Sequence, residues 1–377
     1  MSKKFMLNMM LVLVLLSILL SACGGTQATT QAPVEPTKPA AEPTAAVVPT
    51  EPAVAPTEAA AAGPTELHMA AILTVGLDNA WDRTFVEAYK RVQAEKPHGL
   101  TMADLDYTEG VWGDEAETVL RAYAESGKYD IIWAHSTYSD QVKNLKDEFP
   151  EIAWVVVGSG NEGLGGNVYW VYKRIHEPSY LMGILAGCST KTNVIGAVGT
   201  YAYDDVNDEI NAFFEGAKSV NPDVSQKVSF IESWYDPAKA LEAANAQIAA
   251  GVDHMDMIAE SYEPCVENNI LCYGIYQDYN FAAPENVLTS ALAFWDPDIK
   301  WVIDGWYNHK TTGEPYNAPP EKHWFNMKDG ASGLADFHGV DAKIPQECMD
   351  KYNQAYQDFM DGKLDVPLNI EVPVSTP

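Results

Sequence analysis

The stretch AILTVGLDNAWDRTF, residues 71–85, contains the two periodicities that decide the fold class. It begins as an apolar strand, breaks at a glycine, and continues into an amphipathic helix with Phe85, Tyr89 and Val92 on one face. The break leaves Trp81 among polar residues at the tip of the strand. Packing between lobes would bury this ring, whereas a binding site would keep it at the tip, so the stretch alone permits both interpretations.

The same alternation of strand and helix continues along the chain. One helical pattern, Asp236 to Gly251, begins with Asp-Pro, which is typical of an N-cap followed by the first helical residue, and ends in glycine. Such alternation predicts α/β architecture with doubly wound parallel sheets, and about 310 residues after Glu66 predict two lobes. The predicted strands are Leu67–Val75, Tyr129–Ala134, Ile152–Val157, Val168–Tyr172, Val194–Val198, Val228–Glu232, Met255–Ala259, Cys272–Ile275 and Val287–Ala293.

The N-terminus predicts export and a lipid anchor. An apolar run from Met9 to Leu20 follows two lysines and, at ~12 residues, is too short to span a bilayer. It ends in Leu-Ser-Ala-Cys, which resembles a bacterial lipobox, although an ordinary signal peptide with a chance cysteine is the alternative. We expect a lipoprotein signal peptide over residues 1–22, acylation of Cys23, and a disordered Ala/Pro/Thr-rich tether over residues 23–65. The folded part would then lie at the extracytoplasmic face of the cell membrane.

Composition argues against several classes of function. The chain has 53 acidic and 24 basic residues and a formal net charge of −29, which disfavours binding to nucleic acid or to an anionic membrane surface. No GxSxG, P-loop or HExxH pattern occurs, so we expect no enzyme, no metal and no cofactor. Cys265 and Cys272 could form a disulfide, but the sequence does not establish the pairing.

Candidate ligand-binding residues follow the predicted strands, because doubly wound sheets bind ligands beyond the carboxyl ends of their strands. Aromatic walls combined with a few polar groups suit a planar, hydrogen-bonding solute. Asp78 could equally be a helix N-cap, and Asp82 could be a solvated carboxylate in the first helical turn. The candidates are Asp78, Asn79, Trp81, Asp82, Ser136, Trp234, Tyr276 and Asp278.

Several segments resemble the basic membrane protein family of ABC-transporter substrate-binding lipoproteins. The most specific is NAFFEGAKSVNPDVSQKVSFIESWYDPAKALEAANAQIAAGVD, and RIHEPSYLMGILAG and WFNMKDGASGLADF are also similar. The resemblance covers nearly all of Leu67 to Pro367 and implies a type I periplasmic-binding-protein fold, with two lobes joined by a hinge. We expect an N-terminal lobe over residues 66–173, joined by about 290–312, and a C-terminal lobe over 174–289, joined by about 313–370.

The resemblance also implies a ligand and partners. A purine-type solute, either a nucleobase or a nucleoside, would be captured by lobe closure and delivered to an ABC permease and its ATPase by a monomeric receptor. Trp81 falls on the family's stacking phenylalanine, and Asp82 falls on an asparagine and is expected to accept hydrogen bonds.

One departure from the family pattern bears on the ligand. Tyr276 stands where the family often has a ribose-facing aspartate, while Asp278 keeps the second aspartate. The loss of the first carboxylate favours a free base, or another small planar solute, over a nucleoside. A sensing module that signals to a membrane regulator is the alternative function, and a nucleoside hydrolase is a third.

Overall fold

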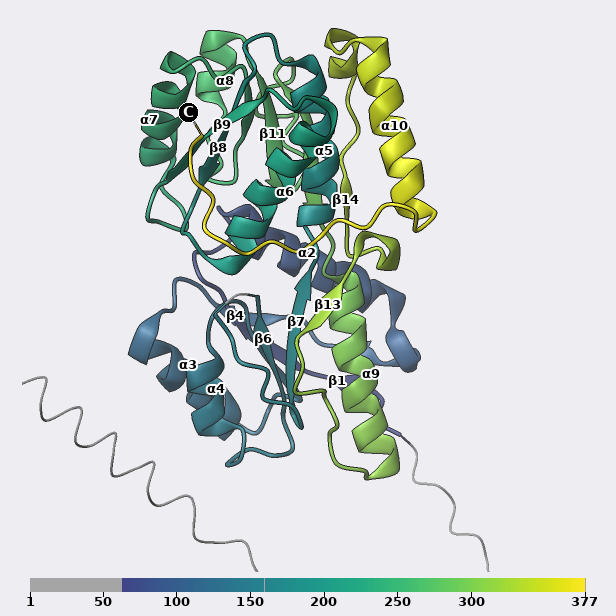
Figure 1. Cartoon of the computed structure of the whole chain (residues 1–377). Coiled ribbons are helices and arrows are strands. Elements are labelled where there is room, and N and C mark those ends of the chain that lie inside the picture. The colour runs from purple at the N-terminus through teal and green to yellow at the C-terminus, as the bar shows by residue number, and fades with distance from the viewer. Residues whose placement is uncertain (1–62, 159, 377) are drawn as a thin grey trace, which may run out of the picture. The chain divides into compact units, whose positions relative to one another are not determined.

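The computed structural model describes residues 63–158 and 160–376 of the chain. The expected signal peptide, Cys23 and nearly all of the expected tether lie outside these described residues. Within the described ranges, no helix combines the length and the apolar character needed to cross a membrane. The described part contains two α/β lobes, each built on a six-stranded sheet (Figure 1).

The N-terminal lobe is a parallel sheet with helices on both faces. Its strand order is β13-β7-β6-β5-β2-β4. Two further short strands, β1 (Glu66–Leu67) and β3 (Thr101–Met102), pair with each other in a separate two-stranded sheet. In Figure 1, α3 and α4 lie on one side of the sheet and α9 lies on the other, where it packs against α2. The strands are β2 (Met69–Ile72), β4 (Asp106–Thr108), β5 (Ile131–Ala134), β6 (Ala153–Val157), β7 (Val168–Lys173) and β13 (His323–Phe325); the helices are α2 (Ala80–Glu95), α3 (Gly113–Glu125), α4 (Ser139–Leu145) and α9 (Asp296–Thr312).

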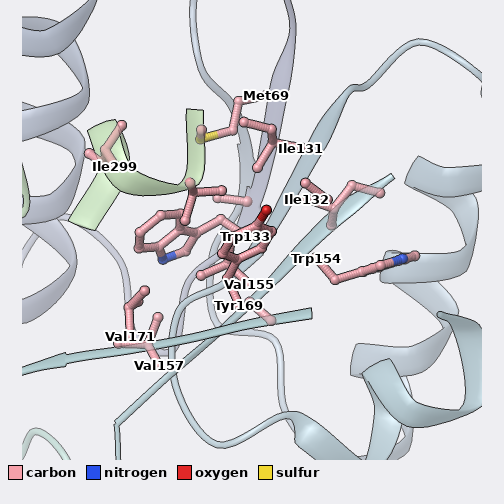
Figure 2. Packing of buried hydrophobic residues seen from close by; sticks show 14 of the residues in the cluster. Met69, Ile131, Ile132, Trp133, Trp154, Val155, Val157, Tyr169, Val171 and Ile299 are labelled. Carbon is pink, nitrogen blue, oxygen red and sulfur yellow. The ribbon is translucent and has the colours of Figure 1, made fainter. Parts of the chain in front are cut away.

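The core of this lobe explains why its strands are continuously apolar. Trp133 pairs in register with Val155, and Ile132 pairs with Trp154, so the two tryptophans point to opposite faces of the sheet. Figure 2 shows Trp133 among side chains of β2, β6, β7 and α9, with Trp154 directed away from them. Trp133 is fully buried and stacks on Phe85 of α2 at a centroid distance of 4.8 Å. Because helices cover both faces, every position on the four central strands β2, β5, β6 and β7 is buried, and strict apolar/polar alternation is lost there.

The C-terminal lobe repeats this plan. Its strand order is β14-β12-β11-β10-β8-β9, and β14 alone among the described strands of this sheet is antiparallel. Helices α5, α6 and α10 cover one face, and α7 and α8 cover the other (Figure 1). The strands are β8 (Val194–Gly199), β9 (Ser225–Phe230), β10 (His254–Asp256), β11 (Leu271–Tyr276), β12 (Val287–Ala293) and β14 (Ser332–Leu334); the helices are α5 (His176–Ser189), α6 (Asp204–Val220), α7 (Pro237–Ala249), α8 (Glu263–Asn268) and α10 (Gln346–Met360).

Helices α5 and α6 approach each other at backbone distance because glycines lie at their contact. A Cβ atom built on Gly183 would lie 1.9 Å from the carbonyl oxygen of Phe213, and one built on Gly216 would lie 2.0 Å from that of Tyr180. No side chain larger than hydrogen fits at either position without moving a helix. This contact therefore fixes the position of α6, whose first turn faces the space between the lobes.

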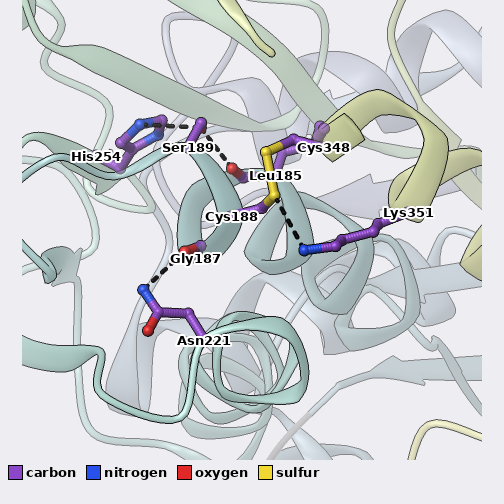
Figure 3. The surroundings of a disulfide bond; sticks show 8 residues. All are labelled: Leu185, Gly187, Cys188, Ser189, Asn221, His254, Cys348 and Lys351. Atoms are coloured by element: carbon purple, nitrogen blue, oxygen red, sulfur yellow. Dashed lines mark hydrogen bonds between the residues drawn. A yellow bond between two sulfur atoms is a disulfide. The ribbon is translucent and has the colours of Figure 1, made fainter. Parts of the chain in front are cut away.

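Two disulfides stabilise the C-terminal lobe. One joins Cys265 of α8 to Cys272 of β11, the pair that the sequence left open. The other joins Cys188 of α5 to Cys348 of α10, across 160 residues of sequence. Figure 3 shows the second bond holding α10 against α5, with the Lys351 amine 3.7 Å from the sulfur of Cys188.

The chain crosses between the lobes after Lys173, after Ala293 and after Phe325. The last crossing comes later in the chain than expected. The sequence placed the return to the C-terminal lobe at about residue 313, whereas the chain returns after Phe325. Strand β13 instead extends the N-terminal sheet by pairing with β7, with Trp324 opposite Tyr172. Short edge strands of this kind carry little periodicity, which is why the sequence did not predict β13.

Candidate functional site

A pocket lies between the two lobes, at the carboxyl ends of both sheets. Most of its lining residues lie at or just beyond the end of a strand, which is where doubly wound sheets bind ligands. Each lobe contributes equally to the walls, so the pocket is complete only when the lobes are together. The N-terminal lobe contributes Thr74, Asn79, Trp81, Ser136, Thr137 and Val157, and the C-terminal lobe contributes Thr200, Asp205, Trp234, Ile258, Glu260 and Tyr276.

The indole of Trp81 is held by the N-terminal lobe while it lines the pocket. The Asn79 side chain caps α2 by accepting a hydrogen bond from the Trp81 backbone N–H at 3.0 Å. The indole Nε1 donates to the carbonyl oxygen of His135 at 3.1 Å, and the ring meets Trp295 edge to face at 4.9 Å. Packing and exposure to the pocket therefore coexist at this half-buried side chain.

Tyr276 faces Trp81 from the other lobe. The two rings meet edge to face with a centroid distance of 5.2 Å, which makes them a pair of aromatic walls from opposite lobes. Tyr276 ends β11 with a left-handed backbone, φ 64°, which is unfavourable for a residue with a Cβ atom. Burial raises the pKa of its hydroxyl well above the usual value, so this group is a neutral donor or acceptor.

Ser136 and Trp234 also line the pocket, as the positions after their strands predicted. Ser136 follows β5, and its backbone carbonyl accepts a hydrogen bond from the Asn161 side chain at 2.9 Å. Trp234 follows β9 and packs edge to face against Tyr201 at 4.9 Å. Each lobe thus presents a tryptophan to the pocket.

Asp82 does not line the pocket, which differs from its expected role as a ligand acceptor. Its carboxylate is buried and accepts hydrogen bonds from the backbone N–H groups of Val75 and Gly76, both at 2.8 Å, and from the hydroxyl of Thr74 at 3.2 Å. Burial raises the pKa of Asp82 to about 6, while these hydrogen bonds lower it. The residue orders the loop that carries Trp81 instead of meeting the pocket directly.

Asp78 and Asp278 also lie outside the pocket lining. Asp78 is exposed, and the N-cap of α2 is its neighbour Asn79. One carboxylate oxygen of Asp278 accepts from the backbone N–H of Asn280 at 2.9 Å, and the other lies 2.6 Å from Nε2 of His338. Asp78 and Asp278 are thus close in sequence to the pocket residues Trp81 and Tyr276 without lining the pocket themselves.

Two acidic residues that the sequence did not single out do line the pocket. Glu260 accepts hydrogen bonds from the Tyr279 hydroxyl at 2.5 Å and from the Asn79 side chain at 3.3 Å. Asp205 lies in the first turn of α6 and is buried. Their positions were the signal that could have found them. Glu260 directly follows the predicted strand Met255–Ala259, and Asp205 lies in the first turn of the helix that follows the predicted strand Val194–Val198.

The lining is acidic, since it includes Asp205 and Glu260 but no lysine or arginine. Burial raises the pKa of Glu260 to about 7, and it raises those of Asp208 and Glu209, which are buried on α6, well above their usual values. A lining rich in carboxyl oxygens favours solutes that donate hydrogen bonds. Across the described residues, no group of His, Cys, Asp and Glu side chains is arranged to hold a metal ion.

Comparison with known proteins agrees with this architecture. The chain is 28% identical over 233 residues to a purine-binding protein of Brucella abortus, an alignment that covers 60% of this chain and 63%, less than two thirds, of that protein. It is 26% identical over 316 residues to a Haloferax volcanii protein described as an ABC transporter glucose-binding protein, covering 81% of this chain and 75% of that one.

A solved structure and a family model identify the fold and the family. An ABC transporter solute-binding protein from Conexibacter woesei superposes with a TM-score of 0.63 at 18% identity, over 80% of this chain and 99% of that chain, which shows the same fold. The family model Bmp, described as ABC transporter substrate-binding protein PnrA-like, matches residues 71–359. The chain therefore belongs to the Bmp family of PnrA-like ABC transporter substrate-binding proteins.

Proposed function

We propose that this protein is the extracytoplasmic receptor of an ABC importer and that it captures a purine-type solute between its two lobes. The observation that carries the proposal is the aromatic corner formed by Trp81 and Tyr276, whose rings meet edge to face, in a pocket that otherwise presents hydroxyls, an amide and carboxylates. A planar heterocycle with N–H groups satisfies both kinds of wall, because its faces stack and its edges donate hydrogen bonds.

Lobe closure is the proposed mechanism of capture. Two hydrogen bonds cross between the lobes beside the pocket, from the Asn79 side chain to Glu260 at 3.3 Å and from Arg83 to the Gln277 side chain at 3.1 Å. A solute that touches both walls stabilises the closed arrangement, and the permease and its ATPase would act on that state. The solute would leave chemically unchanged, as expected for a member of a family of substrate-binding proteins.

A free base is the favoured ligand over a nucleoside. A carboxylate at position 276 could accept from two ribose hydroxyls at once, whereas Tyr276 offers a single hydroxyl and a larger ring. That ring already contacts Trp81, so a ribose in this part of the pocket would have to displace it. We further propose anchoring to the membrane through an acylated Cys23 and the segment that follows it, which lie outside the described residues.

Calorimetric titration tests the proposal. The panel contains adenine, guanine, adenosine, inosine and uridine, together with glucose, because a relative is described as binding that sugar. We expect a purine base to bind with a Kd below about 100 μM, which corresponds to about −5.5 kcal/mol. Failure of all the purines to bind at this level, or tighter binding of glucose, would refute the purine assignment.

A further inference from the structure

Glu260 is fixed in the pocket by groups from both lobes. One of its carboxylate oxygens accepts from the Tyr279 hydroxyl at 2.5 Å, within the C-terminal lobe. The other accepts from the side-chain amide of Asn79 at 3.3 Å, across the cleft. Asn79 in turn caps the helix that carries Trp81, so the carboxylate is connected to the proposed stacking wall.

The backbone at Glu260 is left-handed, with φ 53°. A left-handed φ is tolerated most easily by glycine, which has no Cβ atom to clash, as at Gly158 after β6 with φ 77°. A glutamate in this conformation is held in an unfavourable geometry, and such residues concentrate at ligand sites. The strained backbone therefore places the Glu260 carboxylate in the pocket wall, at a conformation for which glycine would be the easier residue.

Several ionisable groups face Glu260, and they set its charge. Burial, the largest influence, raises the pKa of this carboxyl to about 7, while the hydrogen bond from Tyr279 and the positive charge of Arg83 lower it. Arg83 is itself engaged by the Leu77 carbonyl and by Gln277, so it does not form an ion pair with Glu260. The facing groups are Arg83 and Asp82 from α2, Tyr235 before α7, Tyr262 at the start of α8, and Tyr276 and Tyr279 around the end of β11.

We propose that Glu260 is a specificity-determining residue that accepts a hydrogen bond from an N–H group of the solute. The inference rests on the proposed function and names the chemistry that the pocket selects, namely a neutral or protonated heterocycle with an N–H donor. Anionic solutes such as nucleotides are disfavoured, because the described residues that line the pocket include two carboxyl groups and neither lysine nor arginine. The Asn79 contact joins recognition to lobe closure, because the carboxylate that would accept from the solute also accepts from Asn79 of the opposite lobe.

Ionisation of Glu260 gives the proposal a pH signature. The ionised carboxylate accepts from a solute N–H strongly, whereas the protonated carboxyl accepts weakly. Affinity for adenine, which keeps its charge over the pH range used, should rise with pH by up to about tenfold per unit below the pKa of Glu260 and level off above it.

The test is calorimetric titration of adenine into the full chain at pH 5.5, 7.0 and 8.5, with wild type, Glu260→Gln and Glu263→Gln. Glu263 is the matched control, since it is exposed, lies outside the pocket lining and accepts from the Ser261 hydroxyl at 3.1 Å. We expect the wild type and Glu263→Gln to gain at least about tenfold in affinity over this range. Glu260→Gln should bind at least about tenfold more weakly at pH 8.5 and show little pH dependence.

A second variant keeps the proposal falsifiable if Glu260→Gln is poorly folded. Tyr279→Phe removes the hydroxyl that lowers the pKa of Glu260, so the rise in affinity should move to higher pH. An unchanged profile in Tyr279→Phe, or wild-type affinity and slope in Glu260→Gln, would overturn the role of Glu260 and leave the proposed function standing. If the wild type binds no adenine at any pH and no other purine in the panel, both proposals fail.

Discussion

Replacing Asp256 by asparagine should make the stability of the protein less sensitive to a rise in pH from 5 to 8. Asp256 ends β10 and is fully buried, and neither of its carboxylate oxygens has a hydrogen-bond partner among the described residues. Burial raises its pKa from 3.8 to about 8, so the folded state keeps the proton at neutral pH while the unfolded chain releases it. Stabilisation from this proton is fully present below the unfolded pKa and is lost as pH rises through the folded pKa.

The magnitude follows from the displaced titration. Each pH unit between the two pKa values changes the free energy of unfolding by about 1.4 kcal/mol. Ionisation of Asp256 should therefore lower the free energy of unfolding by about 4 kcal/mol between pH 5 and pH 8. Asparagine has nearly the same shape and no charge, so Asp256→Asn removes this dependence and retains the volume. Other buried carboxyls with raised pKa values, including that of Glu177 at about 7, add slope that both proteins share.

Urea unfolding at pH 5.0, 6.5 and 8.0, followed by far-UV circular dichroism, measures the effect. The wild type should lose stability steadily with pH, and Asp256→Asn should lose about 4 kcal/mol less over the same range. Asp223→Asn, a change at an exposed carboxyl, is the control and should follow the wild type. Parallel pH profiles for Asp256→Asn and the wild type would refute the argument that Asp256 is protonated in the folded state.

Three further substitutions test packing, charge and binding. Gly183→Ala should destabilise the protein by at least about 2 kcal/mol in urea unfolding, because its Cβ would lie 1.9 Å from the Phe213 carbonyl oxygen; an unchanged midpoint would mean that α5 and α6 can separate at no cost. Lys173→Met should cost about 3–5 kcal/mol, because it leaves the buried Asp298, 3.3 Å away, without its cation; the added change Asp298→Asn should recover much of the loss, and no recovery would contradict the pairing. Trp81→Ala should weaken adenine binding by about 1–3 kcal/mol in calorimetry, whereas undiminished affinity with retained structure would assign Trp81 to packing alone.

The sequence predicted most of the described strands of both sheets because their apolar runs record burial on both faces. Strand β12 has the predicted bounds, Val287–Ala293, and α7 begins after the predicted N-cap Asp236, whose side chain accepts from the Lys239 backbone N–H at 3.1 Å. Strand β4 and the late strands β13 and β14 were not predicted, because three-residue strands at the edge of a sheet lack the apolar run that marks the central strand β10. The disulfide between Cys188 and Cys348 joins positions too far apart in sequence for spacing to indicate it.

The sequence by itself determined the local elements and the region where a ligand would bind. Periodicity, capping residues and glycines are properties of short segments, so they predict strands, helices and the loops at strand ends. They therefore predicted that the loop around Trp81 lies at the edge of an α/β sheet.

The tertiary structure decided which side chains from those loops share the pocket. Asp82 and Trp81 are neighbours in sequence, yet successive helical residues point in different directions, and the carboxylate of Asp82 turns back to the backbone N–H groups of its own loop. Glu260 reaches the pocket because a left-handed backbone turns it there and because Asn79 meets it from the opposite lobe. Contacts between lobes join residues that are far apart in the chain, so no local pattern records them.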